Sequence, residues 1–306
     1  MSITNIFSLS KIRSKIRDFL IVSRINIQVG TPPNALIGIL LAAKNLEDIL
    51  NLHIVTYFIL CILLVTFASN INCLYDISVD EKYKKHLSKA VRSLGRKNIK
   101  IILLIEVMVG FSLMYFLYLR GYFVVFFLAV VGLFLAIAYS MPPLRIKKRG
   151  FLSPLPVFFG LYLLIPVGGW YMVRNDLTFD AVIFFSSYFL MNSGFILVNV
   201  TEDYQEDREE NIRTWAHIMG VKNTLKIALI FSLFGYLAIV VISKHLINKP
   251  FAILFLLFAI FGISLSSFDI YKAMQEGSIK RYAKKMPFWF IITRYPMVLA
   301  LFVSLF

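Results

Sequence analysis

The sequence is poor in charge, cysteine and histidine, and each scarcity excludes a class of protein. Charged residues make up 16% of the 306 residues, against 59% hydrophobic residues, a balance outside the range of ordinary soluble domains. The two cysteines, Cys61 and Cys73, lie in one hydrophobic stretch without metal-ligand spacing, so neither a disulfide framework nor a cysteine metal site is expected. The four histidines are scattered, which argues against a histidine metal site. The composition indicates an integral membrane protein.

Acidic residues are scarce as well, and the excess of positive charge needs a partner. The chain has 32 Lys and Arg against 17 Asp and Glu, a formal net charge of +15. A basic chain can bind nucleic acid, but 29 phenylalanines and repeated apolar runs are poorly compatible with a solvated basic domain. We therefore expect no nucleic-acid partner, and a lipid bilayer as the surface that this charge meets.

Long hydrophobic runs dominate the chain after residue 28. A membrane-spanning helix needs about 20 mostly apolar residues, and nine runs approach that measure, near 29–44, 53–75, 98–119, 121–140, 151–173, 179–200, 223–243, 250–268 and 287–306. The predicted fold class is an all-α integral membrane protein, with a bundle of nine transmembrane helices in one domain, 29–306. Residues 1–28 form a basic amphipathic lead-in, in which 6–24 is equally compatible with an interfacial helix and with a simple approach to the first span.

The distribution of Lys and Arg predicts how this bundle is oriented in the cell membrane. Counted on alternate sides of the nine predicted spans, 26 lie on the N-terminal side and 5 on the other. Because positively charged loops stay in the cytoplasm, we expect the N-terminus and the loops 76–97, 141–150 and 201–222 to be cytoplasmic. Nine spans place the C-terminus on the opposite side.

Two windows of acidic residues share one spacing, Asn-x3-Asp-x3-Asp. The first window is Asn72, Asp76 and Asp80, and the second is Asn199, Asp203 and Asp207. Residues four apart lie on one helix face, about 6 Å apart along the axis, so each window lines up oxygen ligands of the kind that Mg²⁺ shares with phosphate.

The repetition of this spacing carries more weight than either window alone. One window is equally compatible with a solvated helix end. Two identical windows on the cytoplasmic side, separated by a block of four spans, favour a Mg²⁺-diphosphate site and indicate an internal duplication. Two facing stripes can hold metal ions around a diphosphate, which leaves readily from an allylic isoprenoid chain.

A third cytoplasmic loop, 139–150, carries a stiff basic turn. Pro142 and Pro143 stop the preceding helix. Arg145 and Lys147 follow the turn and alternate with apolar residues, so they are the candidates for binding a diphosphate. Lys148 and Arg149, further on, are compatible with an ordinary basic flank of a membrane helix.

At these residues the chain resembles the UbiA family of intramembrane prenyltransferases. The resemblance rests on the first acidic window, on the Tyr-Ser-x-Pro-Pro-x-Arg-x-Lys run that starts at Tyr139, and on Asp203-x3-Asp207-Arg208 followed by Thr214 and Gly220. It implies a nine-helix bundle with a cap of cytoplasmic loops, and Mg²⁺-dependent transfer of a polyprenyl group, geranylgeranyl in our prediction, from its diphosphate to a lipid-soluble or aromatic acceptor.

The resemblance also implies roles for individual residues. It places Asn72, Asp76, Asp80, Asp203 and Asp207 in the Mg²⁺-diphosphate shell, with Asn199 as a helper. Tyr139, Arg145, Lys147, Arg208 and Arg24 are the expected diphosphate contacts, and Lys147 joins the four aspartates as a catalytic residue.

The chain departs from the family pattern in three places. The usual Arg-Pro pair after the first window is missing, and Lys84, Lys85, Lys89 and Arg92 are all candidates to replace its arginine. After the second window, Asn211 replaces the usual glycine, a modest change because Asn tolerates left-handed backbone angles. Trp215 and His217 stand where smaller or basic residues are expected, so the acceptor class stays open.

Several alternatives remain at this point. A secondary transporter also places acids in a repeated bundle, although its acids are expected at the bilayer midplane rather than at span ends. A soluble isoprenoid synthase also uses two Asp-rich helices, but the nine hydrophobic runs argue against it. For an enzyme, the acceptor is a glycerol-phosphate ether lipid, a quinone precursor or a porphyrin side chain. No oligomeric state is predicted.

Two charges inside predicted spans belong to neither window. Glu106 in the third span and Arg294 in the ninth have opposite sign and lie at similar predicted depth, about 10–12 Å. Because an unpaired charge inside a bilayer is costly, we expect a direct ion pair. The alternatives are that each charge faces the reaction cavity separately, or that Arg294 turns toward the cytoplasmic surface and contacts the diphosphate.

Overall fold

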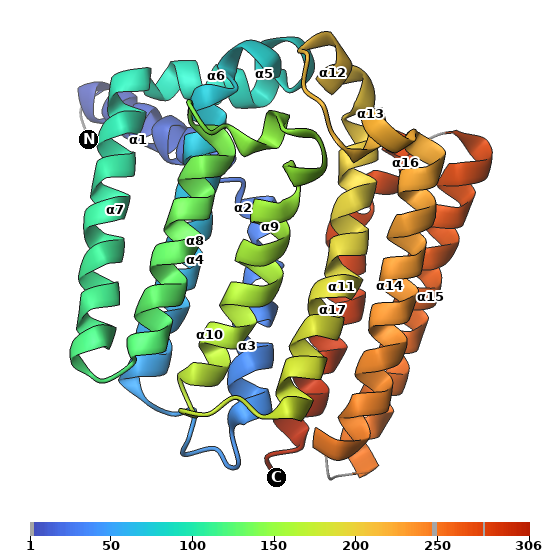
Figure 1. Ribbon diagram of the computed structural model, residues 1–306. Helices are drawn as coiled ribbons and strands as arrows, with labels where there is room; N and C mark the ends of the chain where they lie inside the picture. Colours follow the sequence, from blue (N-terminus) through green and yellow to red (C-terminus); the bar gives the residue numbers. More distant parts are fainter. Residues whose placement is uncertain (1–2, 247–249, 278) are drawn as a thin grey trace.

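The structure is a computed structural model that describes residues 3–246, 250–277 and 279–306. Long helices run side by side as a bundle, and short helices cover one end of it (Figure 1). The described residues contain no named strand and a single isolated bridge, between Arg149 and Arg213. The predicted all-α class is confirmed.

The bundle is built from long helices and one interrupted helix. These are α3 (Thr31–Ala42), α4 (Leu52–Tyr75), α7 (Arg96–Leu119), α8 (Phe123–Ser140), α9 (Leu155–Phe159) with η3 (Gly160–Leu164) and α10 (Ile165–Tyr171), α11 (Phe179–Glu202), α14 (Val221–Leu246), α15 (Pro250–Glu276) and α17 (Met286–Val303). The remaining helices are short or lie at one end: α1 (Ile3–Val22), α2 (Ile25–Gln28), α5 (Ile77–Tyr83), α6 (Lys85–Leu94), η1 (Ile146–Lys148), η2 (Gly150–Leu152), α12 (Tyr204–Glu209), α13 (Trp215–Met219) and α16 (Ile279–Ala283).

Among the described residues, seven helical segments are long and apolar enough to cross a membrane. Two of the nine predicted spans fall outside this group. The first coincides with α3, which is only 12 residues long, and the eighth coincides with α15, which includes side chains outside the described set. The count of nine therefore stays a prediction.

The outside of the bundle is apolar, as contact with lipid requires. Leu104 and Met108 on α7 are 60% and 61% exposed, and Phe127 on α8 is 62% exposed. The core lies between the helices, where close contacts replace a hydrophobic driving force. At Gly38 of α3, a Cβ atom would lie 1.8 Å from the carbonyl oxygen of Pro166 in α10, so only glycine allows these helices to approach.

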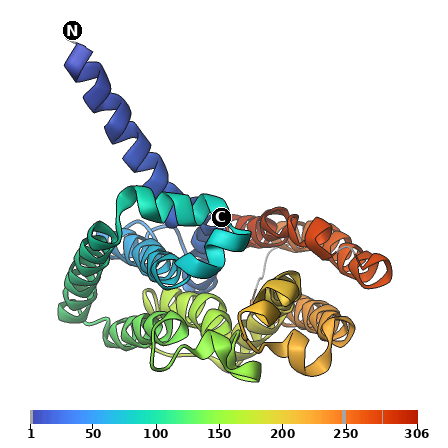
Figure 2. The same cartoon turned by 90° about the horizontal axis from the view of Figure 1, so that it is seen from above.

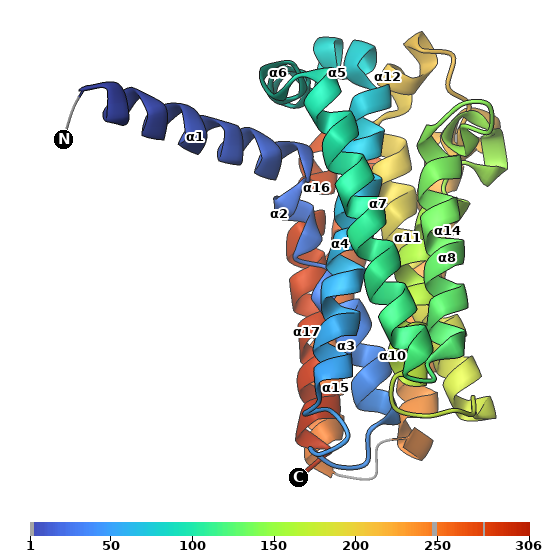
Figure 3. The same cartoon turned by 90° about the vertical axis from the view of Figure 1, so that its left-hand side faces the viewer.

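The N-terminal helix α1 leaves the bundle sideways (Figures 2 and 3). It lies at the end that carries α5, α6 and α12, whereas the C-terminus lies at the other end (Figure 1). Ile12 and Ile16 on α1 are more than half exposed. The interfacial position of this helix stays a prediction.

The predicted ion pair between Glu106 and Arg294 is wrong. Glu106 Oε1 accepts a hydrogen bond from Asn70 Nδ2 at 2.6 Å, whereas Arg294 Nε donates to Asn192 Oδ1 at 2.8 Å. The Arg294 guanidinium also lies 3.8 Å from the centre of the Phe290 ring. Helices α7 and α17 lie on different sides of the bundle (Figure 2), so amides and aromatic faces stabilise each charge separately.

Candidate functional site

Both acidic windows have the same local structure, a helix that bends at the central aspartate. Asp76 ends α4 and precedes α5, and Asp203 ends α11 and precedes α12. The backbone bonds four residues apart continue through the first bend, from Asp76 N to Asn72 O at 3.0 Å and from Asp80 N to Asp76 O at 2.8 Å. The oxygens of each window were predicted to lie along one helix, but they lie on two consecutive helices that meet at the central aspartate, at one end of the bundle.

The basic loop after α8 contacts the first window. Asp76 accepts hydrogen bonds from Lys147 Nζ and, at 3.3 Å, from Arg145 Nη2. Arg145 has a left-handed backbone with φ of 38°, which starts the short helix η1 and turns Lys147 inward, where it is 8% exposed. Burial, opposed by Asp76, lowers the pKa of Lys147. The structure thus brings together three residues that the sequence predicted for one site.

Lys84 connects the two windows. It lies between α5 and α6, and its Nζ donates to the two carboxylate oxygens of Asp203 at 3.1 and 3.2 Å. It also lies 3.9 Å from Glu206. Burial alone lowers the pKa of Lys84, but the charge and hydrogen bond of Asp203 together with the charge of Glu206 outweigh it, so the pKa is raised. Of the four candidates for the missing arginine, Lys84 is the one that reaches the second window, whereas Arg92 pairs with Glu81.

Further contacts join α5 to the end of α12, and α16 to α12. Lys82 donates to Glu210 at 2.7 Å, Tyr83 donates to Glu209, and Lys280 of α16 donates to Glu206 at 3.0 Å. Sequence reasoning missed these contacts because the acids of 206–210 carry no spacing that points to Lys82, Tyr83 or Lys280. The only available signal was the density of acids after the second window.

Two carboxyl groups in the windows lack full compensation by positive charge. Burial, assisted by Asp76 and opposed by Arg24, raises the pKa of Asp80 to about 6. Burial and Asp203 raise the pKa of Asp207 to about 7. Both shifts mean that the carboxylate form of these residues is disfavoured when no ligand is bound. A bound cation would favour the carboxylate form.

The donor atoms in the first window fit a hard cation. Asn72 Oδ1 and Asp80 Oδ2 are buried and have no hydrogen-bond partner, and such oxygens suit Mg²⁺. Within the described part of the chain, no group of three or more His, Cys, Asp or Glu side chains is close enough to hold a metal by itself. An ion here therefore needs further oxygens from a ligand, as Mg²⁺ commonly takes from phosphates.

Arg24 and Tyr139 also interact electrostatically with the acids. Arg24 has a left-handed backbone between α1 and α2, with φ of 49°. Burial alone lowers the pKa of Arg24, but interactions with Cys73, Asp80 and Asp76 together raise it overall. Tyr139, near the end of α8, interacts electrostatically with acids of both windows, Asp76 and Asp207 among them.

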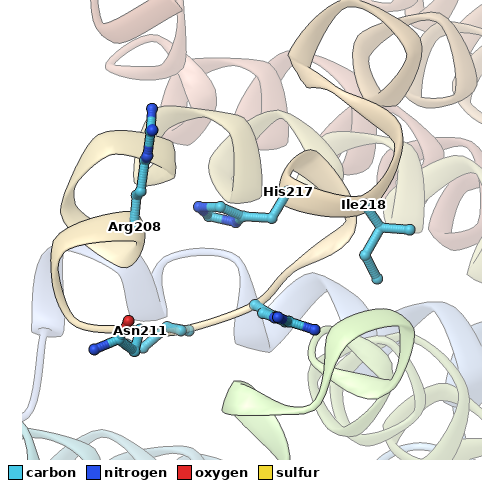
Figure 4. Close-up of a pocket in the computed structure, with 6 residues that line it drawn as sticks. Arg208, Asn211, His217 and Ile218 are labelled. Atoms are coloured by element: carbon cyan, nitrogen blue, oxygen red, sulfur yellow. The ribbon is translucent and has the colours of Figure 1, made fainter.

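Arg208 and Asn199 stand apart from these contacts. Asn199, one turn before Asp203, is exposed. Arg208 is exposed and lines a hollow of about 550 Å³ between α12 and α13, together with Asn211, Ile212, Arg213, His217 and Ile218. The His217 ring extends from α13 toward α12 (Figure 4). Burial and the charge of Arg208 lower the pKa of His217, although a hydrogen bond with the Tyr204 carbonyl opposes this shift.

Comparison with known proteins identifies relatives over nearly the whole chain. The sequence profile of the UbiA prenyltransferase family matches residues 32–291. A UbiA homologue from Archaeoglobus fulgidus, solved with GPP and Mg²⁺, has a TM-score of 0.66 at 13% identity and covers 94% of this chain and 99% of that one. A UbiA homologue from Aeropyrum pernix K1 has a TM-score of 0.63 at 15% identity, covering 92% and 98%.

A third solved structure concerns digeranylgeranylglyceryl phosphate synthase. Its TM-score is 0.62 at 21% identity, and it covers 95% of this chain and 99% of that one. No curated protein matches the sequence. At these identities the solved structures establish the fold, and the profile match over residues 32–291 establishes the family.

Proposed function

The chain belongs to the UbiA prenyltransferase family, and from that premise we propose that it transfers a geranylgeranyl group from its diphosphate to a membrane-associated acceptor and releases pyrophosphate. Membership of this family makes the chain a prenyltransferase. The family and the seven apolar helices together make it a multi-pass membrane protein. The family also argues against a secondary transporter.

One observation carries the proposal, the meeting of both acidic windows with three cationic side chains at one end of the bundle. Lys147 and Arg145 contact Asp76, and Lys84 contacts Asp203. We propose that these cations turn from the carboxylates to the oxygens of the diphosphate when the donor binds. The charge-assisted contacts then hold the leaving group, and the freed carboxylates become metal ligands.

We propose that Asn72, Asp76, Asp80, Asp203 and Asp207 hold Mg²⁺, with Asn199 as a helper. The ion, when bound, neutralises charge on the leaving diphosphate. The buried, unpartnered oxygens of Asn72 and Asp80 support this role. Lys147, Arg145, Arg24 and Tyr139 line the same site and orient the diphosphate. The bond between C1 of the prenyl chain and the diphosphate oxygen breaks with its electron pair on the diphosphate, and the acceptor forms the new bond to C1 and loses a proton.

For the acceptor we propose a glycerol phosphate that already carries one prenyl ether. The basic hollow lined by Arg208, Arg213 and His217 supports this choice over an uncharged quinone precursor, because guanidinium groups bind phosphate in a forked geometry. The likeness to digeranylgeranylglyceryl phosphate synthase agrees with it.

We also propose nine crossings of the cell membrane, with the N-terminus, the windows and the cap of short helices in the cytoplasm and the C-terminus outside. The opposite placement of α1 and the C-terminus along the bundle supports an odd number of crossings (Figure 1). The excess of Lys and Arg at the end that carries the windows supports the cytoplasmic assignment.

The purified protein tests the function directly. It is incubated with labelled geranylgeranyl diphosphate, Mg²⁺ and one acceptor at a time: geranylgeranylglyceryl phosphate, an aromatic quinone precursor or a haem. We expect a Mg²⁺-dependent product that carries one added geranylgeranyl group on the glycerol phosphate, identified by mass spectrometry. A product on the aromatic acceptor alone would reassign the acceptor, and no pyrophosphate release with any acceptor would contradict the proposed reaction.

A further inference from the structure

A lipid-facing groove lies between α1, α4 and α7 and shares no residue with the acidic windows. Its volume is about 600 Å³, and its lining includes Phe19 of α1, Ile62 and Leu63 of α4, and Ile105 and Glu106 of α7. Ile62 and Ile105 are 39% and 53% exposed. A groove of this size is within the usual range of small-molecule sites, about 300–1,000 Å³.

Glu106 is the one acidic residue in the lining of this apolar groove. The residue is only 7% exposed, and its Oε2 is buried without a hydrogen-bond partner. Its Oε1 accepts from Asn70, and within the described ranges no ion pair includes it. Because a buried polar atom without a partner is costly, the free oxygen of Glu106 indicates a ligand rather than a structural contact.

We propose that the groove binds a membrane lipid with an apolar chain and a hydroxyl headgroup, whose hydroxyl contacts Glu106 Oε2 once the carboxyl group turns toward the groove. A hydroxyl both donates and accepts, so it suits a carboxylate and a carboxylic acid equally, whereas an ammonium group suits the carboxylate alone. The isoleucine and leucine side chains of α4 and α7 receive the chain.

Hydrogen bonds link the residue that holds Glu106 to the turn that contains Arg24. Asn70 Oδ1, on the residue that holds Glu106, accepts from Ser23 Oγ at 3.3 Å. Gln28 Nε2 donates to the Ser23 carbonyl at 2.8 Å and to Thr66 at 2.9 Å, and Thr66 also lines the groove. The occupant therefore contacts the hydrogen-bonded chain that holds residues 23–28, the segment from which Arg24 reaches the first window.

Photolabelling of the purified full chain tests this site without using its reaction. The probe is a monoacylglycerol with a diazirine in its acyl chain, added to protein in nanodiscs without Mg²⁺ or prenyl diphosphate. We expect saturable labelling of peptides that contain 59–66 or 102–106. The methyl ester of the same chain cannot donate a hydrogen bond, and we expect it to compete about tenfold more weakly.

Matched variants on α7 separate the groove from general contact with lipid. Ile105→Trp fills the groove and should abolish saturable labelling, whereas Leu104→Trp, at an exposed neighbour outside the groove lining, should keep it. Glu106→Leu should weaken binding about tenfold, with the thermal stability of each variant measured in parallel.

Several outcomes would overturn the assignment. Labelling that never saturates, or that Ile105→Trp leaves unchanged, would identify ordinary surrounding lipid. Unchanged binding by a folded Glu106→Leu variant would remove the headgroup contact, and stronger competition by an alkylamine would overturn the hydroxyl class. None of these results depends on whether the acidic windows bind a prenyl diphosphate, so this inference and the proposed function fail independently.

Discussion

Asp76 receives two cations from the loop after α8, and the neighbouring Lys148 does not reach it. Lys148 Nζ donates instead to the Glu210 carbonyl, at 3.4 Å. We expect Lys147→Ala and Arg145→Ala to raise the KM for the prenyl diphosphate about tenfold or more, because charge-assisted contacts contribute about 1.5–3 kcal/mol each. Lys148→Ala is the matched control and should change KM less than about threefold. Steady-state kinetics at saturating Mg²⁺ measure all three, and equal effects would reduce the loop to a basic membrane flank.

The carboxylates of the windows give a second prediction at the level of single residues. Asp76→Ala, Asp80→Ala, Asp203→Ala and Asp207→Ala should each abolish turnover while the protein still extracts as a folded bundle, because each removes a proposed oxygen ligand. Pyrophosphate release is measured together with size-exclusion behaviour in detergent. Near-normal activity in both the Asp76 and the Asp203 variant would contradict a site shared by the two windows.

Lys84 and Lys85 are adjacent, but only Lys84 contacts the second window. Its Nζ lies near Asp203, whereas Lys85 is exposed. We expect Lys84→Met to lower kcat/KM for the prenyl diphosphate about tenfold or more, because it removes a cation between the windows. Lys85→Met should leave kcat/KM within about threefold of the parent protein. Equal losses in the two variants would assign the effect to the positive charge of the loop as a whole.

Among the helices, α3 and α10 are packed closely enough to give a stability prediction. A Cβ atom on Gly38 would lie 1.8 Å from the Pro166 carbonyl oxygen, whereas a Cβ atom on Gly160 would meet no atom within 4 Å. Gly38→Ala should destabilise the bundle by about 1–3 kcal/mol, as overpacking does in protein cores, and lower the Tm in detergent. Gly160→Ala is the control and should leave the Tm nearly unchanged. A Tm loss confined to Gly160→Ala would contradict this packing.

Much of the fold and part of the site could be predicted from the sequence, because both depend on local patterns. Hydrophobic runs located the long helices, since a bilayer demands such runs. The repeated Asn-x3-Asp-x3-Asp spacing located both windows. In the structure, helical backbone hydrogen bonds between residues four apart continue through Asp76, and Asp203 N donates to Asn199 O at 3.3 Å. The residues that follow the Pro142-Pro143 turn, Arg145 and Lys147, contact Asp76 of the first window, and their binding of diphosphate stays a prediction.

What could not be predicted depends on tertiary placement. Lys84 was one of four equivalent cations until the fold brought it to Asp203. Glu106 and Arg294 were paired by depth and sign, two quantities that say nothing about which side of the bundle a helix occupies. Arg208 follows the second window directly in sequence and lines the hollow between α12 and α13, a position that spacing alone does not give because it does not fix the direction of a side chain on the short helix α12.

The two ends of the bundle differ: the windows and α1 lie at one end and the C-terminus lies at the other (Figure 1). The loop between α3 and α4 lies at the end opposite the windows, and Leu50 within it is 77% exposed. Lys97, at the start of α7, is exposed at the other end. The native Cys61 and Cys73 are buried, so a cysteine introduced at either position is labelled against a low background.

We expect a membrane-impermeant maleimide to label Leu50→Cys in intact cells and Lys97→Cys only after the membrane is opened. The side that holds the windows carries 26 Lys and Arg, against 5 on the other side. Loops rich in Lys and Arg stay in the cytoplasm. A substitution of an unburied residue by cysteine at either end is expected to change stability by less than about 0.5 kcal/mol, so activity serves as a check of folding. The reverse labelling pattern would invert the proposed orientation, and labelling of both positions from one side would contradict the placement of the two loops at opposite faces of the membrane.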